Sequence, residues 1–118
     1  MNTFTLRTGN DQHKTLVFTH LATHGHANVG EWAYLMKADT YLGRVLVLEK
    51  KEKYMNALDT WECRLENGGT VAETMEYLEY LKKQGVLKNN TVYLYLLRHE
   101  THEELRARTD AELKQKKG

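Results

Sequence analysis

Hydrophobic and polar residues alternate at the start of the chain, which is the pattern of a strand with one buried face. Phe4 and Leu6 fall on one side of this segment, and Thr3 and Thr5 fall on the other. A second apolar and β-branched run at 16–21 follows a group of turn-forming residues. We therefore predict that the two segments form an N-terminal β-hairpin.

The spacing of apolar residues changes after Asn28. Asn28 and Glu31 have the spacing of a capping box, and the apolar residues that follow fall on one helical face. This pattern predicts a helix over 28–36, with a strand over 32–36 as the alternative. The short valine- and leucine-rich run at 44–48 predicts a buried strand.

The second half of the chain contains three helical patterns and one strand pattern. Apolar residues at intervals of four, three and four predict an amphipathic helix over 54–65. A capping box at Thr70 opens a second helix over 70–85. The β-branched and aromatic run at 91–97 predicts a central strand, and a last helix is expected over 101–114.

This order of elements predicts an α+β domain, or a small α/β domain. We expect a sheet of roughly four strands with an N-terminal β-hairpin, two consecutive amphipathic helices and a C-terminal helix. The length of 118 residues suits a single compact domain over 1–118, with the basic residues 114–118 as a frayed tail.

Charge and cysteine content exclude several classes of partner. The 17 Lys and Arg residues nearly balance 16 Asp and Glu residues, so no long-range field attracts a nucleic acid. The exposed side of the 70–85 helix is acidic, which also disfavours DNA binding. The single cysteine excludes an intrachain disulfide and a cysteine-based zinc site, and it suits a reducing compartment. No apolar run approaches the ~20 residues of a membrane span. We expect a cytoplasmic protein.

The histidines are the candidates for chemistry, because five of the six fall in two short stretches. The first stretch holds His20, His24 and His26, and the second holds His99 and His102. Both stretches lie where a predicted strand ends and a predicted helix begins, which is the usual ligand-binding edge of an open sheet. If the two strands run parallel and adjacent, one site holds His24, His26, Arg98 and His99.

Such residues suit three different roles. In a phosphate site, Arg98, His26 and His102 bind the anion while His99 or His24 acts as nucleophile or general acid. In a metal site, His24 and His26 hold a divalent ion such as zinc, with His20 or Glu100 as a further ligand. In the third role the histidines are caps or surface groups without any joint function.

Two short runs resemble known motifs. The run Tyr93-Leu94-Tyr95-Leu96-Leu97-Arg98-His99-Glu100-Thr101 resembles the Arg-His-Gly motif of the histidine phosphatase family, in which the His accepts the phosphate. Glu100 stands where that family has Gly. The run Thr23-His24-Gly25-His26-Ala27-Asn28 resembles the start of a metallo-β-lactamase-type metal motif, whose next Asp and His are replaced by Asn28 and Val29. Each match covers fewer than ten residues, so neither assigns a family.

A charge-balanced domain without a complete catalytic motif is expected to act by binding. We predict a small intracellular interaction or regulatory protein that binds and modulates a protein partner, without a resident cofactor. The alternative is a small enzyme or ligand-binding domain with a His/Arg site for a phosphate-bearing or other anionic small molecule. In that case the chain is a phosphohydrolase or a metal-dependent hydrolase.

Overall fold

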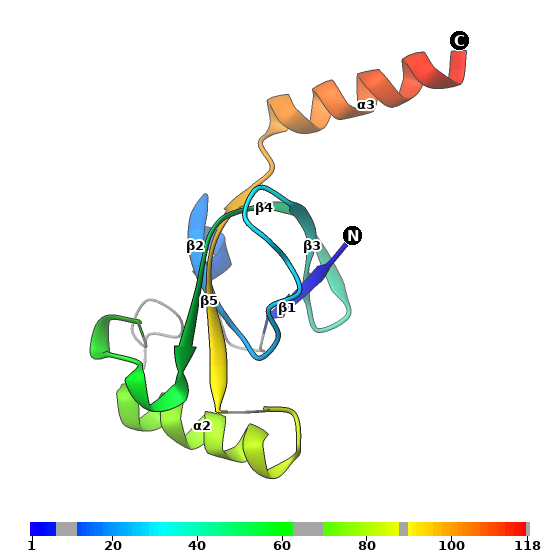
Figure 1. The fold of residues 1–118 in the computed structure, drawn as a ribbon. Coiled ribbons are helices and arrows are strands. Elements are labelled where there is room, and N and C mark those ends of the chain that lie inside the picture. The colour runs from blue at the N-terminus through cyan, green and yellow to red at the C-terminus, as the bar shows by residue number, and fades with distance from the viewer. Residues whose placement is uncertain (7–11, 63–69, 88–89, 118) are drawn as a thin grey trace.

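The computed structural model of the chain describes residues 1–6, 12–62, 70–87 and 90–117 (Figure 1). The strands bounded within these residues are β1 (Thr3–Leu6), β2 (Val17–Ala22), β3 (Trp32–Lys37), β4 (Thr40–Tyr54) and β5 (Thr91–His99). The helices are α2 (Val71–Lys83) and α3 (His102–Lys117), with short 3-10 turns η1 (Gln12–Lys14) and η2 (Met55–Ala57). The prediction of an α+β fold is confirmed.

The five strands form one mixed sheet in the order β1-β3-β4-β5-β2. β1 pairs with β3 in parallel, and every other neighbouring pair is antiparallel. β4 has 15 residues and pairs with β3 through its first part and with β5 through most of its length. β1 and β2 are therefore the two edges of the sheet.

The sheet curls so strongly that its two edges come close together. The ring of Phe4 on β1 lies 5.4 Å from the ring of His20 on β2 and 4.8 Å from that of Tyr95 on β5, measured between centroids. Register shifts in β3–β4 and β4–β5 and the positive φ of Gly43 accompany this bend, as bulges and glycines do in curved sheets. The inside of the curl is the main core, made of Phe4, Leu6, Phe18, Ala27, Ala33, Leu35, Val45, Val47, Tyr95 and Leu97.

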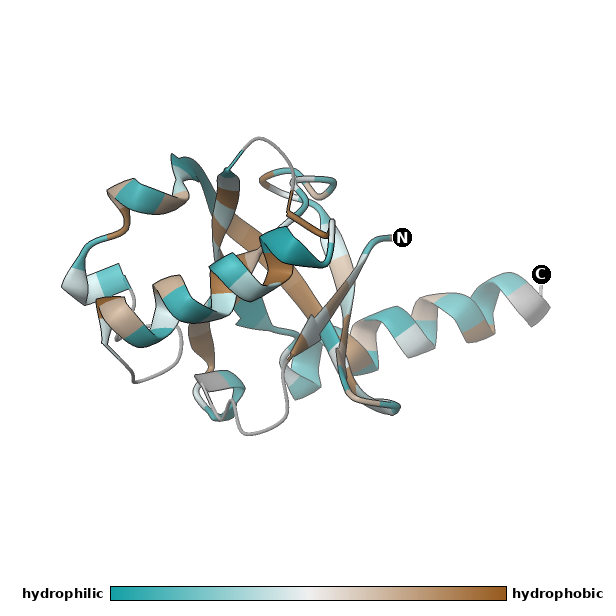
Figure 2. Ribbon diagram, turned by 90° about the horizontal axis from the view of Figure 1, so that it is seen from below, coloured by the Kyte–Doolittle hydropathy of each residue, from teal (hydrophilic) through white to brown (hydrophobic). Residues whose placement is uncertain are grey.

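A second, smaller core lies between α2 and the far end of β4 and β5. Leu78 of α2 and Val92 of β5 are fully buried there, together with Met55, Leu58 and Leu87. Figure 2 shows the hydrophobic strand segments gathered inside the body, with the more hydrophilic side of α2 turned outward. α2 begins as predicted, because the Thr70 hydroxyl accepts a hydrogen bond from the backbone N–H of Glu73 at 3.1 Å.

α3 leaves the body of the molecule and extends beyond it (Figure 1). No residue of α3 belongs to either core. The molecule measures 54 × 25 × 25 Å, and its radius of gyration is 16.0 Å, against roughly 13.5 Å for a compact domain of this length. α3 also continues to Lys117, through the segment predicted to be frayed.

One prediction about the strands is wrong. β1 and β2 do not form a hairpin, since β1 pairs with β3 and β2 pairs with β5. The sheet has five strands, close to the roughly four expected. The alternation that predicts each strand says nothing about its partner. Pairing is decided by how the buried side chains fill the curl.

The predicted helix over 28–36 is also wrong, and its alternative is confirmed as β3. The Asn28 side chain does donate to the Glu31 carboxylate at 2.8 Å. This pair closes a turn, because the N–H of Glu31 donates to the carbonyl of Asn28 at 3.1 Å and Gly30 has φ +89°. Ala33 and Leu35 are then fully buried with the period of two of a strand.

The predicted helix over 54–65 begins too early. Tyr54 ends β4, η2 follows, and a helical turn starts only at 60. Asp59 caps that turn reciprocally with Glu62, through hydrogen bonds of 2.8 and 3.0 Å. The remainder of the predicted helix, 63–65, lies outside the described residues.

Candidate functional site

The two histidine stretches lie at opposite ends of the same pair of strands. β2 and β5 are adjacent, as the hypothesis of a joint site requires, but they are antiparallel, with Val17 opposite Arg98 and Ala22 opposite Tyr93. His99 therefore lies beside the start of β2, whereas His24 and His26 follow its end. Roughly 15 Å of strand separates the two stretches, so the structure does not bring them into one site.

The second stretch is occupied by contacts within the protein. Arg98 donates two hydrogen bonds to Glu104, at 2.6 and 2.9 Å. This bidentate pair raises the pKa of Arg98 and lowers the pKa of Glu104 to about 2. The Nε2 atom of His99 contacts the carbonyl of His13, and its ring packs against Phe18 with centroids 5.0 Å apart.

His102, the first residue of α3, has an exposed side chain. Arg98 and His99 are held as described, so His102 is the exposed histidine of this stretch.

Arg98 belongs to a cluster of charged residues at the root of α3, which we call the root cluster. The guanidinium groups of Arg44 and Arg98 lie over the Trp32 ring, 4.7 and 5.8 Å from its centroid. Around them lie Glu100, Glu104 and Arg108, which complete the root cluster.

Glu100 links the sheet to α3 within the root cluster. Its carboxylate accepts two hydrogen bonds from Arg108, at 3.0 and 3.1 Å, and lies 3.7 Å from Nε of Arg44. The pairing with Glu100 raises the pKa of Arg108. Because the Glu100 side chain is only 8% exposed, this contact is protected from water and fixes the direction of α3.

After β2, the first histidine stretch continues as a loop over 23–27, which hydrogen bonds from β4 and β5 hold against the inner side of the sheet. The Tyr95 hydroxyl donates to the carbonyl of Ala27 at 3.0 Å, and Lys50 donates to the carbonyl of Gly25 at 2.6 Å. Burial raises the pKa of Tyr95, so its hydroxyl stays protonated as a donor. His24 and His26 stack on each other, with ring centroids 5.1 Å apart and planes inclined by 16°.

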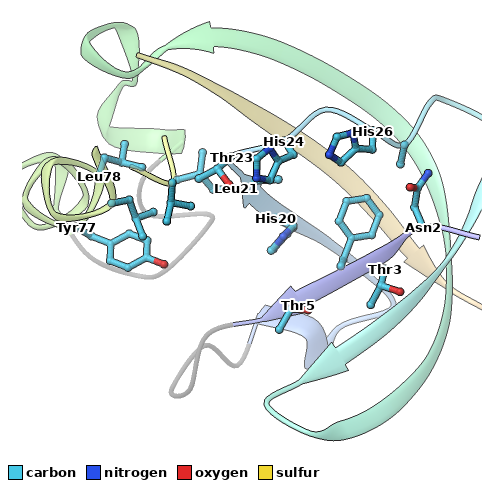
Figure 3. Close-up of a pocket in the computed structure, with 15 residues that line it drawn as sticks. Asn2, Thr3, Thr5, His20, Leu21, Thr23, His24, His26, Tyr77 and Leu78 are labelled. Atoms are coloured by element: carbon cyan, nitrogen blue, oxygen red, sulfur yellow. The ribbon is translucent and has the colours of Figure 1, made fainter. Parts of the chain in front are cut away.

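A groove of about 310 Å³ runs between this loop, the two sheet edges and α2 (Figure 3). Tyr77 and Leu78 of α2 lie at one end and Asn2 lies at the other. His20, His24 and His26 all line the groove. Further apolar lining comes from Phe4, Leu21, Ala22, Ala27, Leu81 and Val86.

The groove follows the edge of β1 rather than one of its faces. Side chains of a strand alternate between faces, but here the four consecutive residues 2–5 all line the groove. The N–H of Tyr34 donates to the carbonyl of Asn2, so even-numbered residues of β1 direct their backbone groups toward β3. The backbone N–H and carbonyl groups of Thr3 and Thr5 therefore point away from β3, and within the described ranges they have no partner.

The three histidines of the groove do not assemble a metal site. Among the described residues, no three His, Cys, Asp or Glu side chains are grouped closely enough to hold one ion. His20 is buried, with its ring edge against Phe4. A zinc ion therefore stays a hypothesis that these side-chain positions do not strengthen.

Sequence reasoning found the histidines but missed the groove and the root cluster. An open sheet edge depends on which strands pair, which no local pattern reveals. The root cluster joins residues from β3, β4, β5 and α3, and the only signal in the sequence is the run Arg98 to Glu100 before the capping box.

No protein family, curated protein or solved structure matches this chain. In the part of the chain that the structure describes, no helix combines the length and the apolar character needed to cross a membrane.

Proposed function

We propose that this protein is a small interaction or regulatory protein that binds an extended segment of a protein partner in the groove beside β1. The observation that carries the proposal is the run of four consecutive edge residues, 2–5, along an apolar groove. A strand edge inside a groove suits β-strand addition, in which a peptide gains backbone hydrogen bonds from the edge and specificity from side-chain pockets.

The backbone groups of Thr3 and Thr5 supply the hydrogen bonds of this proposal. In a peptide that runs beside β1, alternate residues can exchange N–H and carbonyl contacts with them. Proteins usually pair or cover an exposed sheet edge, or protect it with charged side chains. Residues 3–6 of β1 carry no charged side chain, so nothing on the strand itself repels a peptide backbone.

The wall opposite β1 selects the side chains of the peptide. Tyr77, Leu78 and Leu81 of α2 present an apolar surface, while His24 and His26 form the polar rim. We therefore expect peptides with apolar residues at alternate positions, since those side chains point to the same face. A peptide rich in acidic groups is not required, because none of the described residues that line the groove is Lys or Arg.

The alternative, an enzyme or anion-binding domain, has weaker support. It requires Arg98 to grip an anion and His99 to act beside it, but Arg98 holds Glu104 and His99 contacts His13. His24 and His26 line the groove, and no arginine is among the described residues that line it with them. Binding of inorganic phosphate to this pair is the outcome that would favour the alternative.

The proposal is tested with a random peptide library displayed on phage and selected on the intact protein. We expect enriched peptides to shift the backbone amide resonances of residues 3–5 and of α2. In the Thr5→Pro variant, which loses the outward N–H of β1, peptide affinity should fall at least about tenfold. The matched Thr5→Ala variant keeps that N–H and should stay within about threefold of the natural protein.

Three results would overturn the proposal. The first is a library that yields no specific peptide, and the second is binding that shifts resonances away from the groove. The third is phosphate binding that disappears in His24→Ala while Thr5→Pro has no effect on any ligand. Circular dichroism of both Thr5 variants verifies that the fold is retained.

A further inference from the structure

α3 presents a long surface that nothing in the described chain covers. From His102 to Gln115 its side chains are exposed, except for the half-buried Glu104 and Arg108 of the root cluster. Leu105 is 42% exposed and Leu113 is 51% exposed. A helix of 16 residues is marginally stable in water when it stands alone, so a covering partner would stabilise it.

The sequence of α3 is complementary to its own reverse. Over the five positions on either side of Thr109, residues at equal distance from it are either identical or of opposite charge. The pairs are Arg108 with Asp110, Ala107 with Ala111, Arg106 with Glu112, Leu105 with Leu113, and Glu104 with Lys114. This symmetry indicates what kind of surface α3 fits.

We propose that α3 pairs with α3 of a second copy of this chain, antiparallel and centred on Thr109. The inference is independent of the peptide groove beside β1. A two-fold axis through the centre brings the same helix face of both copies together, as an isologous interface requires. Leu105 of each copy then packs on Leu113 of the other.

The seam of this pair is the stripe formed by Leu105, Thr109 and Leu113. Residues four apart lie on the same side of a helix, one turn above another. The Thr109 hydroxyl donates to the carbonyl of Leu105 at 2.9 Å, so its hydrogen bond is already made within α3. It can therefore lie between the two leucine pairs without leaving a polar group unsatisfied.

The seam also points away from the root cluster. Each residue advances about 100° around a helix, so Arg108, which is held by Glu100, lies about a quarter turn from Thr109. The anchored side of α3 and its seam are thus different faces. The body of each copy leaves the stripe accessible to a second helix.

Charges beside the seam choose the antiparallel orientation. Arg106 and Asp110 lie on one flank of the stripe, and Arg108 and Glu112 lie on the other. In the antiparallel pair, equivalent flanks meet, so Arg106 lies near Asp110 of the second copy and Arg108 lies near Glu112. These opposite-charge contacts outnumber the like-charge contacts that Asp110 and Arg108 make with their own equivalents at the two-fold axis. In a parallel pair, opposite flanks meet, and Arg106 lies near Arg108 of the second copy while Asp110 lies near Glu112. Like charges then repel.

The association is expected to be weak. The seam has three side chains from each helix, which is far below the ≈ 800 Å² per partner of a standard interface. We expect a dissociation constant between about 10 µM and 1 mM. The proportion of monomer and dimer then changes with protein concentration.

Analytical ultracentrifugation of the full chain tests the pairing, and a charge exchange makes the test specific. Arg106→Glu places an acidic side chain at position 106 beside Asp110 of the second copy. The repulsion should raise the dimer dissociation constant at least about tenfold. Asp110→Arg places a basic side chain beside Arg106 of the second copy and should raise the dissociation constant to a similar extent. An equimolar mixture of the two variants restores both opposite-charge pairs and should dimerise at least as well as the natural chain.

Cysteine cross-linking tests the orientation in a Cys63→Ser background. An antiparallel pair predicts that Leu105→Cys protein cross-links with Leu113→Cys protein when the two are mixed, but that neither cross-links efficiently with itself. The proposal is overturned if the natural chain stays monomeric at about 1 mM. It is equally overturned if the charge-exchanged mixture dimerises no better than either variant, or if Leu105→Cys cross-links mainly with itself.

Discussion

Gly25 occupies a position in the histidine loop where no larger residue fits the present packing. A β-carbon built on Gly25 would lie 2.5 Å from Cε1 of Tyr93, well inside van der Waals contact. The Tyr93 ring is covered on its face by the Lys50 ammonium, 5.5 Å from the centroid, and that ammonium also holds the Gly25 carbonyl. The Tyr93 ring can therefore pack against the histidine loop because Gly25 has no side chain.

We expect Gly25→Ala to lower the free energy of unfolding by about 1–3 kcal/mol, because the extra methyl group overpacks the contact with Tyr93. Urea denaturation measures the change. The double variant Gly25→Ala with Tyr93→Ala serves as the control, since removing the ring should make the alanine almost harmless. A loss of stability that is the same with and without the ring would contradict this account.

At the scale of single residues, the sequence predicts which side chains are chemically capable but not which of them are free to act. Arg98, His99 and His24 are suitable for anion chemistry by type. Two of the three are held by partners distant along the chain or on α3, namely His13 and Glu104. Such partners are set by tertiary contacts, so the sequence alone could not distinguish a free histidine from a satisfied one.

Among the elements, α3 depends most on electrostatics for its position. The Thr101–Glu104 capping box forms as predicted, with hydrogen bonds of 3.0 and 3.1 Å. The Glu104 carboxylate also receives Arg98, and these contacts hold its pKa at about 2. A single carboxylate therefore both caps the helix and ties it to β5.

The depressed pKa of Glu104 predicts a loss of α3 order in acid. A carboxyl whose pKa is lower in the folded state stabilises that state above its unfolded pKa, near 4.5. That stabilisation disappears as the pH falls from about 4.5 toward 2. Amide hydrogen exchange of α3, followed across this range, should show protection falling in the natural chain.

A matched pair of variants isolates the effect. Glu104→Gln should have weakly protected α3 amides already at neutral pH, with little further change in acid. Glu103→Gln removes a neighbouring carboxylate on an exposed side chain and should behave like the natural chain. Equal acid sensitivity in Glu104→Gln and Glu103→Gln would show that Glu104 is not the group responsible.

Three elements with strong local signals are predicted correctly, and those decided by long-range contacts are not. Capping boxes predict α2 and α3, and a β-branched and aromatic run predicts β5. β3 was predicted as a helix because its cap-like pair, Asn28 and Glu31, closes a turn instead. The parallel pairing of β1 with β3 has no local signature at all, and the groove depends on that pairing.

For the whole molecule, the body should fold without α3. Neither core contains an α3 residue, so removal of 102–118 should lower the melting temperature by less than about 5 °C. Leu78→Ala in α2 is the comparison, because this fully buried side chain should cost about 2–5 kcal/mol. Calorimetry at low protein concentration measures both. If the truncated chain unfolds more easily than Leu78→Ala, α3 contributes to the body after all.

The position of β5 has a consequence for synthesis of the chain on the ribosome. β5 lies between β4 and β2, although it is formed by residues 91–99 of 118. Until these residues emerge, β2 has no neighbour in the sheet, and Phe18 and His20 stay outside any core. The sheet can therefore be completed only after residues 91–99 have emerged, which leaves the apolar side chains of β2 without their partner strand until then.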